Sequence, residues 1–269
     1  MFAWLNDRLV LRPNRHPIQA PGKMRRMIDM PGGRFEVYVQ RAGRLERSPE
    51  LFVLKFSGTA GRAERAGVHP ADVWDDLAVE VWAVNPPGYG GSPGRASLRH
   101  AAGMAEAIYT AIRQEAGDRP IVVTGNSLGT TTALLTAARY DVAGLILRNP
   151  LPMRELILGR FGWWNLHLAA PVFARHLPTE LCSIRNALRS TAPAVFISSS
   201  RDRIIPPKYQ QLVFEAHAGP RRIMRLPEAD HADPMSEEEA REYVKMLGWL
   251  REHIPLGEVE RSTPNLQGG

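Results

Sequence analysis

The chain has 269 residues, with 34 Lys or Arg against 28 Asp or Glu and a formal net charge of +6. Hydrophobic residues make up 44% and charged residues 23%, which are ordinary globular proportions and exclude a disordered, collagen-like or disulfide-built chain. Cys182 is the one cysteine, so an intramolecular disulfide and a cysteine-based zinc site are also excluded.

The positive charge is concentrated at the start of the chain. The first 47 residues hold ten basic and four acidic residues, and the remainder is neutral. We interpret this stretch as a solvated, arginine-rich flank, with weak contact to an anionic membrane surface as the alternative. No nucleic-acid-binding signature, signal peptide or run of about 18 apolar residues is present. We therefore expect a cytoplasmic protein, peripheral at a membrane surface in the alternative interpretation, without a nucleic-acid partner.

Short apolar runs predict the strands. A hairpin is expected at 27–40, where Phe35, Val37 and Val39 alternate with polar residues. Six further strands are predicted at Leu51–Phe56, Val79–Val84, Pro120–Thr124, Val142–Leu147, Pro193–Ile197 and Arg221–Leu226.

Helices are predicted between these strands. The expected ranges are His69–Leu77, Ser97–Ala116, Thr130–Arg139, a segment that Pro206-Pro207 opens and Gly219 closes, and a segment from the capping box at Ser236 to about Ile254. The alternation predicts one α/β domain at 27–254 with a mostly parallel sheet covered by helices on both faces. Residues 1–26 form the basic segment, 151–190 an insert that breaks the alternation, and 255–269 a flexible tail.

Polar side chains follow several of the predicted strands. Thr59, Ser127, Asp202 and His231 each come just after a strand, and the carboxyl ends of parallel strands meet at one edge of a sheet. We expect these four residues to lie close together.

Ser127 lies in Gly125-Asn126-Ser127-Leu128-Gly129, between a strand and a helix. A serine on such a sharp turn has a strained backbone, and the flanking glycines leave room for the turn. Ser127 also stands at a helix N-terminus, which favours negative charge. The pattern predicts a nucleophile, and the alternative is a helix N-cap between packing glycines.

A serine nucleophile needs a general base and an acid that orients it. His231 follows a late strand and is the predicted base, with His167 and His176 in the insert as remote alternatives. Asp202 is the predicted acid, and the alternative is that it caps the following helix. The backbone N–H groups of Leu128 and Thr59 are predicted to form an oxyanion hole.

These residues, in the chain order Ser, Asp, His, resemble the α/β-hydrolase superfamily, in particular its small-lidded esterases and serine-aminopeptidase-like members. The resemblance covers about residues 27–254. Ser57-Gly58 stands where the family often has His-Gly, and the loop around Tyr89 resembles the family's Gly-Tyr-Gly-x-Ser loop beside the active site.

The insert stands where the family carries a lid. The resemblance implies a substrate pocket, to which we assign Tyr89, Phe161, Trp163 and Trp164. The apolar lid favours an uncharged acyl group.

The expected function is a carboxylesterase- or lipase-like serine hydrolase that acts on a small acyl substrate through an acyl-serine intermediate, with a thioester or amide as less favoured substrates. No metal and no cofactor are required. The alternatives are an acyltransferase with the same triad and a non-catalytic protein of this fold that binds a ligand.

Overall fold

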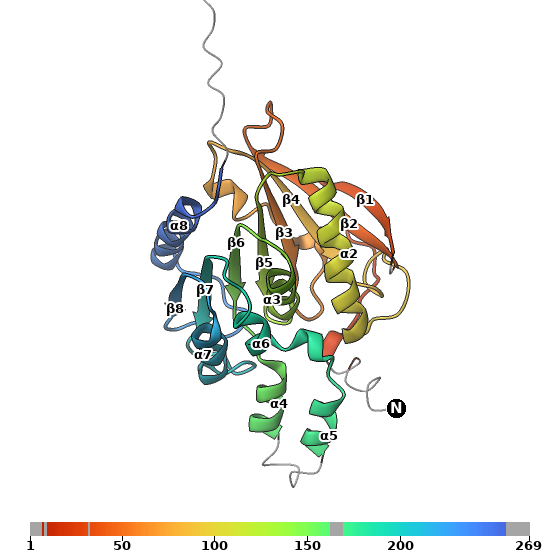
Figure 1. Ribbon diagram of the computed structural model, residues 1–269, viewed down its shortest axis with the longest axis vertical. Coiled ribbons are helices and arrows are strands. Elements are labelled where there is room, and N and C mark those ends of the chain that lie inside the picture. Colours follow the sequence, from red (N-terminus) through yellow and green to blue (C-terminus); the bar gives the residue numbers. More distant parts are fainter. Residues whose placement is uncertain (1–6, 8–9, 32, 162–168, 257–269) are drawn as a thin grey trace, which may run out of the picture.

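The predicted strands form one eight-stranded sheet in the order β1-β2-β4-β3-β5-β6-β7-β8 (Figure 1). This is a computed structural model that describes residues 7, 10–31, 33–161 and 169–256. The strands are β1 (Met24–Met30), β2 (Gly33–Gly43), β3 (Leu51–Phe56), β4 (Ala78–Asn85), β5 (Ile121–Asn126), β6 (Gly144–Arg148), β7 (Ala194–Ser199) and β8 (Arg221–Leu226). β2 pairs antiparallel with both β1 and β4, and every other pairing is parallel. The mostly parallel sheet is therefore confirmed, although β1 begins at Met24, inside the segment assigned to the basic flank.

Helices cover both faces of the sheet (Figure 1). The side chains of Phe52, Leu54 and Phe196 share one apolar core with residues of α2 (Leu98–Ala116), α3 (Gly129–Arg139), α6 (Ser183–Ala187) and α7 (Pro207–Ala216). Alternate side chains, such as Val53 and Ile146, share a second core with α8 (Glu237–Glu252). The two cores follow from the period of two residues along a strand, which sends successive side chains to opposite faces. The capping box at Ser236 is present at the start of α8.

The predicted helix at His69–Leu77 is wrong. The structure has two short 3-10 helices in this part of the chain, η1 (Ala63–Arg65) and η2 (Ala71–Val73). The hydrogen bonds in this stretch close tight turns of three residues, from the Val73 N–H to the Pro70 carbonyl and from the Leu77 N–H to the Trp74 carbonyl, both at 3.0 Å, and not the four-residue turns of an α-helix. One consequence is that α8 covers its face of the sheet without a long helix beside it.

The insert forms short helices at the carboxyl ends of the parallel strands. They are α4 (Met153–Phe161), α5 (Ala169–Arg175), η3 (Thr179–Leu181) and α6. α4 and α5 project beyond the lower edge of the sheet in Figure 1. This is the edge at which β5 ends and Ser127 follows.

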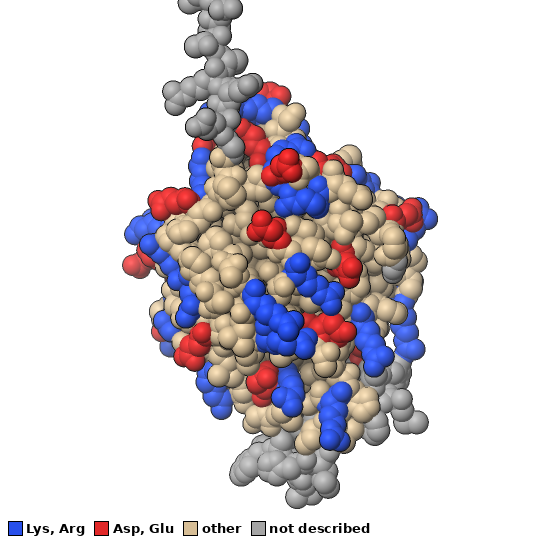
Figure 2. Space-filling model, viewed as in Figure 1, with Lys and Arg blue, Asp and Glu red and all other residues tan. Residues whose placement is uncertain are grey.

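Several arginines of the basic segment contact the domain. Arg15 donates to the carbonyls of Gly88 at 3.1 Å and Gly94 at 2.6 Å, and Arg26 forms an ion pair with Glu115 at 2.7 Å. Figure 2 shows acidic and basic side chains interspersed over one face of the molecule. No helix within the described ranges is long and apolar enough to cross a membrane.

Candidate active site

Ser127 lies on the tight turn between β5 and α3. Its φ of 53° is in the left-handed region, as expected for a strained strand-to-helix turn. Its N–H donates to the Arg148 carbonyl at 2.9 Å, which fixes the turn to β6. The neighbouring glycines are required by close backbone contacts, since a Cβ on Gly129 would lie 2.1 Å from the Phe56 carbonyl oxygen. This backbone presents the Ser127 hydroxyl at the edge of the sheet.

The structure brings Ser127, His231 and Asp202 together, although 104 residues separate the first two in the chain. The Nε2 atom of His231 lies 3.0 Å from the Ser127 Oγ, and its Nδ1 atom lies 2.6 Å from the Asp202 Oδ2. The imidazole therefore bridges the hydroxyl and the carboxylate. With the proton on Nδ1 donated to Asp202, Nε2 is free to accept the serine proton.

Asp202 is held by four donors. Its Oδ1 accepts the N–H groups of Ile204 at 2.8 Å and Ile205 at 2.7 Å, and its Oδ2 accepts from Gln210 Nε2 at 3.0 Å and from His231. The carboxylate side chain has no exposed surface. Each oxygen thus has a defined role, with Oδ1 anchored to the backbone and Oδ2 directed at the imidazole. Sequence reasoning missed Gln210, because its position on the first turns of α7 gives no pattern that points back to Asp202.

The loop that carries His231 is held by hydrogen bonds that involve the side chains of Asp230, Arg203 and Arg148. The Asp230 Oδ1 accepts the His231 N–H at 2.7 Å and the Arg203 N–H at 3.0 Å. These backbone hydrogen bonds, followed by the hydrogen bond from the Arg203 side chain, lower the pKa of Asp230 to about 2. Arg148 donates to the Asp233 carbonyl of the same loop.

Asn149 joins this loop to the sheet. Its Nδ2 donates to the His231 carbonyl at 2.9 Å, and its Oδ1 accepts the Ser199 N–H at 3.0 Å. Asn149 is fully buried and has a φ of 49°, which asparagine tolerates better than most residues. The only sequence signal was its position before Pro150 at the end of a strand, and that signal did not identify a role.

The predicted oxyanion donors lie on both sides of Ser127. Gly58 passes so close that a Cβ there would lie 3.2 Å from the Ser127 Cβ, and Thr59 follows in the same turn. Leu128 is the N-cap residue of α3. Within the described chain, neither the Thr59 nor the Leu128 N–H donates to another residue. Both groups are therefore available to a ligand, although their role in an oxyanion hole stays a prediction.

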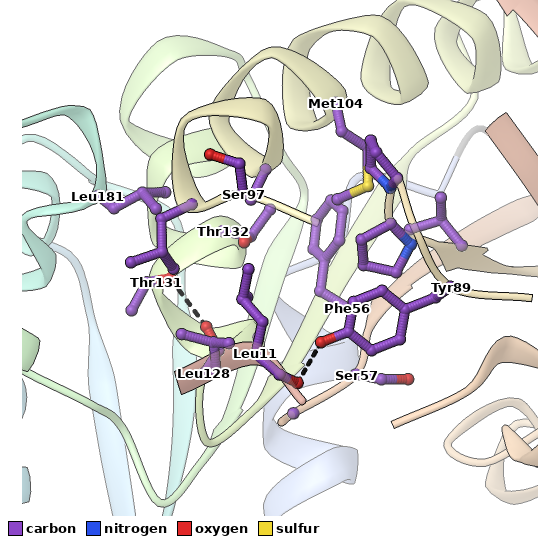
Figure 3. Close-up of a pocket in the computed structure, with 17 residues that line it drawn as sticks. Leu11, Phe56, Ser57, Tyr89, Ser97, Met104, Leu128, Thr131, Thr132 and Leu181 are labelled. Carbon is purple, nitrogen blue, oxygen red and sulfur yellow. Dashed lines mark hydrogen bonds between the residues drawn. The ribbon is translucent and has the colours of Figure 1, made fainter. Parts of the chain in front are cut away.

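A cleft of about 1610 Å³ contains Ser127, His231 and Thr59. Tyr89 does not line this cleft. It lies instead beside a small pocket of about 30 Å³ behind Leu128, where its hydroxyl donates to the Leu11 carbonyl (Figure 3). Ser57, Gly58 and Leu128 line this small pocket as well, so Tyr89 lies close to the turn that carries Ser127, and its assignment to the substrate pocket stays a prediction.

The other proposed pocket residues cannot be placed in this cleft, because Trp163, Trp164 and the side chain of Phe161 lie outside the described residues. Among the described residues of the insert, the apolar side chains that line the cleft are those of Leu151, Met153, Leu156 and Ile157. No group of three or more His, Cys, Asp or Glu that could hold a metal ion occurs in the described ranges.

Comparisons with known proteins agree with this architecture. The family model of the alpha/beta hydrolase fold matches residues 71–210. The uncharacterized protein Rv2307c of Mycobacterium tuberculosis is 28% identical over 249 residues, which cover 87% of this chain and 83% of that protein.

Solved structures share the fold at low sequence identity. The Pyrococcus furiosus esterase Pf2001 has a TM-score of 0.66 at 13% identity, covering 91% of this chain and 97% of the esterase. The Pyrococcus horikoshii acylaminoacyl peptidase has a TM-score of 0.65 at 15% identity, covering 90% of this chain but only 43% of the peptidase. Because the family model matches more than half of the sequence and the sheet has the expected topology, this chain belongs to the α/β-hydrolase fold family.

Proposed function

We propose that this protein is a serine hydrolase that cleaves a carboxylic ester through an acyl-Ser127 intermediate. The observation that carries the proposal is the bridging imidazole of His231, 3.0 Å from the Ser127 hydroxyl and 2.6 Å from the Asp202 carboxylate. Support comes from the Pyrococcus furiosus esterase Pf2001 and the acylaminoacyl peptidases, hydrolases that share this fold.

The first half of the reaction forms the acyl-enzyme. The His231 Nε2 accepts the hydroxyl proton as the Ser127 Oγ bonds to the ester carbonyl carbon, and the carbonyl electrons move onto oxygen. The N–H groups of Thr59 and Leu128 stabilise this oxyanion, while Asp202 stabilises the imidazolium. When the carbonyl re-forms, the bond to the alcohol oxygen breaks and the imidazolium protonates the departing alcohol.

The second half releases the acid. His231 now accepts a proton from water, whose oxygen bonds to the acyl carbon. The second tetrahedral intermediate then collapses, the imidazolium returns a proton to the Ser127 Oγ, and the carboxylic acid leaves. The overall reaction converts one ester and one water molecule into one carboxylic acid and one alcohol.

Labelling with a fluorophosphonate tests the nucleophile. The wild-type protein should be labelled at one serine, and Ser127→Ala should abolish labelling while leaving the protein folded. Ser57→Ala is the matched control, because Ser57 is the other serine that lines the described part of the cleft. Loss of labelling in Ser57→Ala with retention in Ser127→Ala would reassign the nucleophile, and absence of labelling in folded wild type would refute the proposal.

A further inference from the structure

The cleft around Ser127 has two halves of different chemistry. One half is lined by apolar residues of α4 and its surroundings, namely Leu151, Met153, Leu156, Ile157, Ile204 and Ile205. The walls of the other half include His69, Val73 of η2 and Tyr243 of α8. Ser127 stands in the same cleft as both halves.

The charges that line this cleft are almost all positive. Among the described residues that line the cleft, Asp72 is the one acidic residue, and seven are basic, namely Arg12, Lys55, Arg62, Arg65, Arg148, Arg160 and Arg203. A cleft lined by one sign of charge concentrates its electric field and raises the local concentration of ligands of opposite charge.

Some of these charges are neutralised nearby. Arg62 pairs with Glu64, and Arg203 pairs with Asp230 at 2.6 Å. By contrast, the Lys55 Nζ donates to the carbonyl oxygens of Gly67 and His69, and backbone carbonyls carry no net charge.

Arg148 and Arg65 are not neutralised either. Arg148 donates to the Asp233 carbonyl, and neither arginine has a carboxylate within 4.0 Å in the described part of the chain. Lys55, Arg65 and Arg148 therefore have no salt-bridge partner within the described residues, although Asp72 attracts the Lys55 ammonium, and Glu239 and Asp233 attract the Arg148 guanidinium, over longer distances.

The sheet register places Lys55 and Arg148 on the same face. Lys55 pairs with Thr124, and Thr124 pairs with Ile146, two residues before Arg148. Side chains two residues apart on a strand share a face, so both cations belong to the face that α8 covers. Thr124 and Ile146 lie between them and also line the cleft.

Tyr243 of α8 adds a neutral donor to this half. Its side chain is 93% buried, since its exposed fraction is 7%, and burial raises the pKa of its hydroxyl well above the ordinary value of 10. The hydroxyl thus stays protonated at neutral pH and is able to donate a hydrogen bond.

We propose that the substrate ester is anionic, with a carboxylate or phosphate group that lies between Lys55 and Arg148 and an apolar part that lies beneath α4. This inference rests on the proposed function and names its substrate class. It replaces the uncharged acyl group expected from the lid alone, because that expectation did not include the cations of β3 and β6 that line the cleft. The structure assigns both halves to one cleft, and the test therefore places the anion on each side of the ester bond in turn.

The test compares matched esters. One pair has 4-nitrophenyl esters of a neutral acyl chain and of the same chain ending in a carboxylate, and a second pair places the carboxylate on the alcohol, as phenyl acetate and 4-carboxyphenyl acetate. A third pair replaces the carboxylate by a phosphate group. Each kcat/KM is divided by the rate of uncatalysed hydroxide hydrolysis. We expect at least one anionic ester to be preferred by about tenfold or more at low ionic strength, with the preference falling as salt is added. Equal or better hydrolysis of the neutral ester in every pair would overturn the proposal.

Variants locate the preference in the cleft. Lys55→Gln should lower the ratio of anionic to neutral kcat/KM by about tenfold, and Arg65→Gln, at the exposed rim, by about two- to threefold. Lys245→Gln is the control, because Lys245 lies on α8 with its side chain 75% exposed and does not line the cleft. If Lys55→Gln fails to fold, the rim variant decides, and a ratio that neither variant moves overturns the assignment.

The pH dependence gives an independent readout. Burial lowers the pKa of Lys55 to about 8, with Asp72 acting in the opposite direction and Lys23 adding to the decrease. His69 also faces this ammonium, and burial lowers its pKa, so it is neutral where Lys55 titrates. The anionic preference should therefore fall as pH rises through about 8 in the wild type, and this step should be absent in Lys55→Gln. A preference that stays constant from pH 7 to pH 9 contradicts the role of Lys55.

The two proposals fail differently. Fluorophosphonate labelling of Ser127 together with hydrolysis of neutral esters only would retain the serine hydrolase and reject the anionic substrate. Absence of both labelling and ester hydrolysis would reject the hydrolase itself.

Discussion

Replacement of Asp202 by asparagine tests the catalytic geometry in the most direct way. In the wild type, Oδ1 accepts two backbone N–H groups and Oδ2 accepts from His231 and Gln210. An asparagine must keep its oxygen at the two N–H groups, since the flipped amide would direct its NH₂ group at both donors. Its NH₂ group then faces the His231 Nδ1.

This orientation favours the other tautomer of the His231 imidazole. A donor at the position of Oδ2 makes Nδ1 the acceptor and places the histidine proton on Nε2, where it cannot accept a proton from Ser127. Loss of the correct tautomer in another serine hydrolase triad lowers kcat about 10⁴-fold, which corresponds to about 5.5 kcal/mol of transition-state stabilisation. We expect a decrease of this order in kcat/KM for Asp202→Asn.

The assay is hydrolysis of a 4-nitrophenyl ester by Asp202→Asn, with unfolding followed in parallel to establish that the variant is folded. Asp230→Asn is the matched control, because this carboxylate accepts the backbone N–H of His231 and does not contact the ring. Asp230→Asn should lose less than about tenfold. A loss below tenfold in Asp202→Asn, or a larger loss in Asp230→Asn, would refute the assignment of the acid.

Three further predictions concern the supports of the site. Gly129→Ala should destabilise the fold by about 2 kcal/mol or more in denaturant unfolding, because its Cβ would overlap a backbone carbonyl. Gly248→Ala in α8 is the control: its Cβ would meet nothing within 4 Å, and the substitution should stabilise the fold by up to about 1 kcal/mol. Asn149→Ala should lower kcat about 10- to 100-fold with a smaller change in KM, because the His231 loop loses its tie to β7. Asp230 has a folded-state pKa of about 2, below its ordinary value of 3.8, so its contribution to stability is present above pH 3.8 and is lost as pH falls through 2. The difference in unfolding free energy between wild type and Asp230→Asn should accordingly shrink from pH 5 to pH 2, and a constant difference would contradict that pKa.

The sequence was sufficient for the sheet because apolar runs between glycine- and proline-rich loops mark buried strands. The predicted range Leu51–Phe56 agrees with β3, and Arg221–Leu226 agrees with β8. The proximity of Ser127, Asp202 and His231 was also accessible, since each residue follows a parallel strand and such strands end at one edge. Neither argument depends on the packing of side chains.

The residues that position Asp202 and His231 could not be predicted from these patterns. Gln210 reaches Asp202 from eight residues away, and Asn149 reaches the His231 carbonyl from 82 residues away. Buried amides of this kind satisfy specific donors and acceptors, and their partners depend on loop conformation that no periodic pattern encodes. Tyr89 illustrates the same difficulty, because its motif did not indicate that its hydroxyl donates to the Leu11 carbonyl.

The cationic half of the cleft arises from the element that the sequence predicted incorrectly. In place of a regular helix at residues 69–77 the chain has the short η2 (Ala71–Val73), and Lys55 and Thr124 of the sheet line the cleft together with His69, Asp72 and Val73. Removal of an ammonium or guanidinium from water is costly even where carbonyl oxygens accept its hydrogen bonds, as they do for Lys55 and Arg148, and an anion bound in the cleft offsets more of that cost. For this reason the local departure from the predicted helix and the proposed charge of the substrate have the same structural origin.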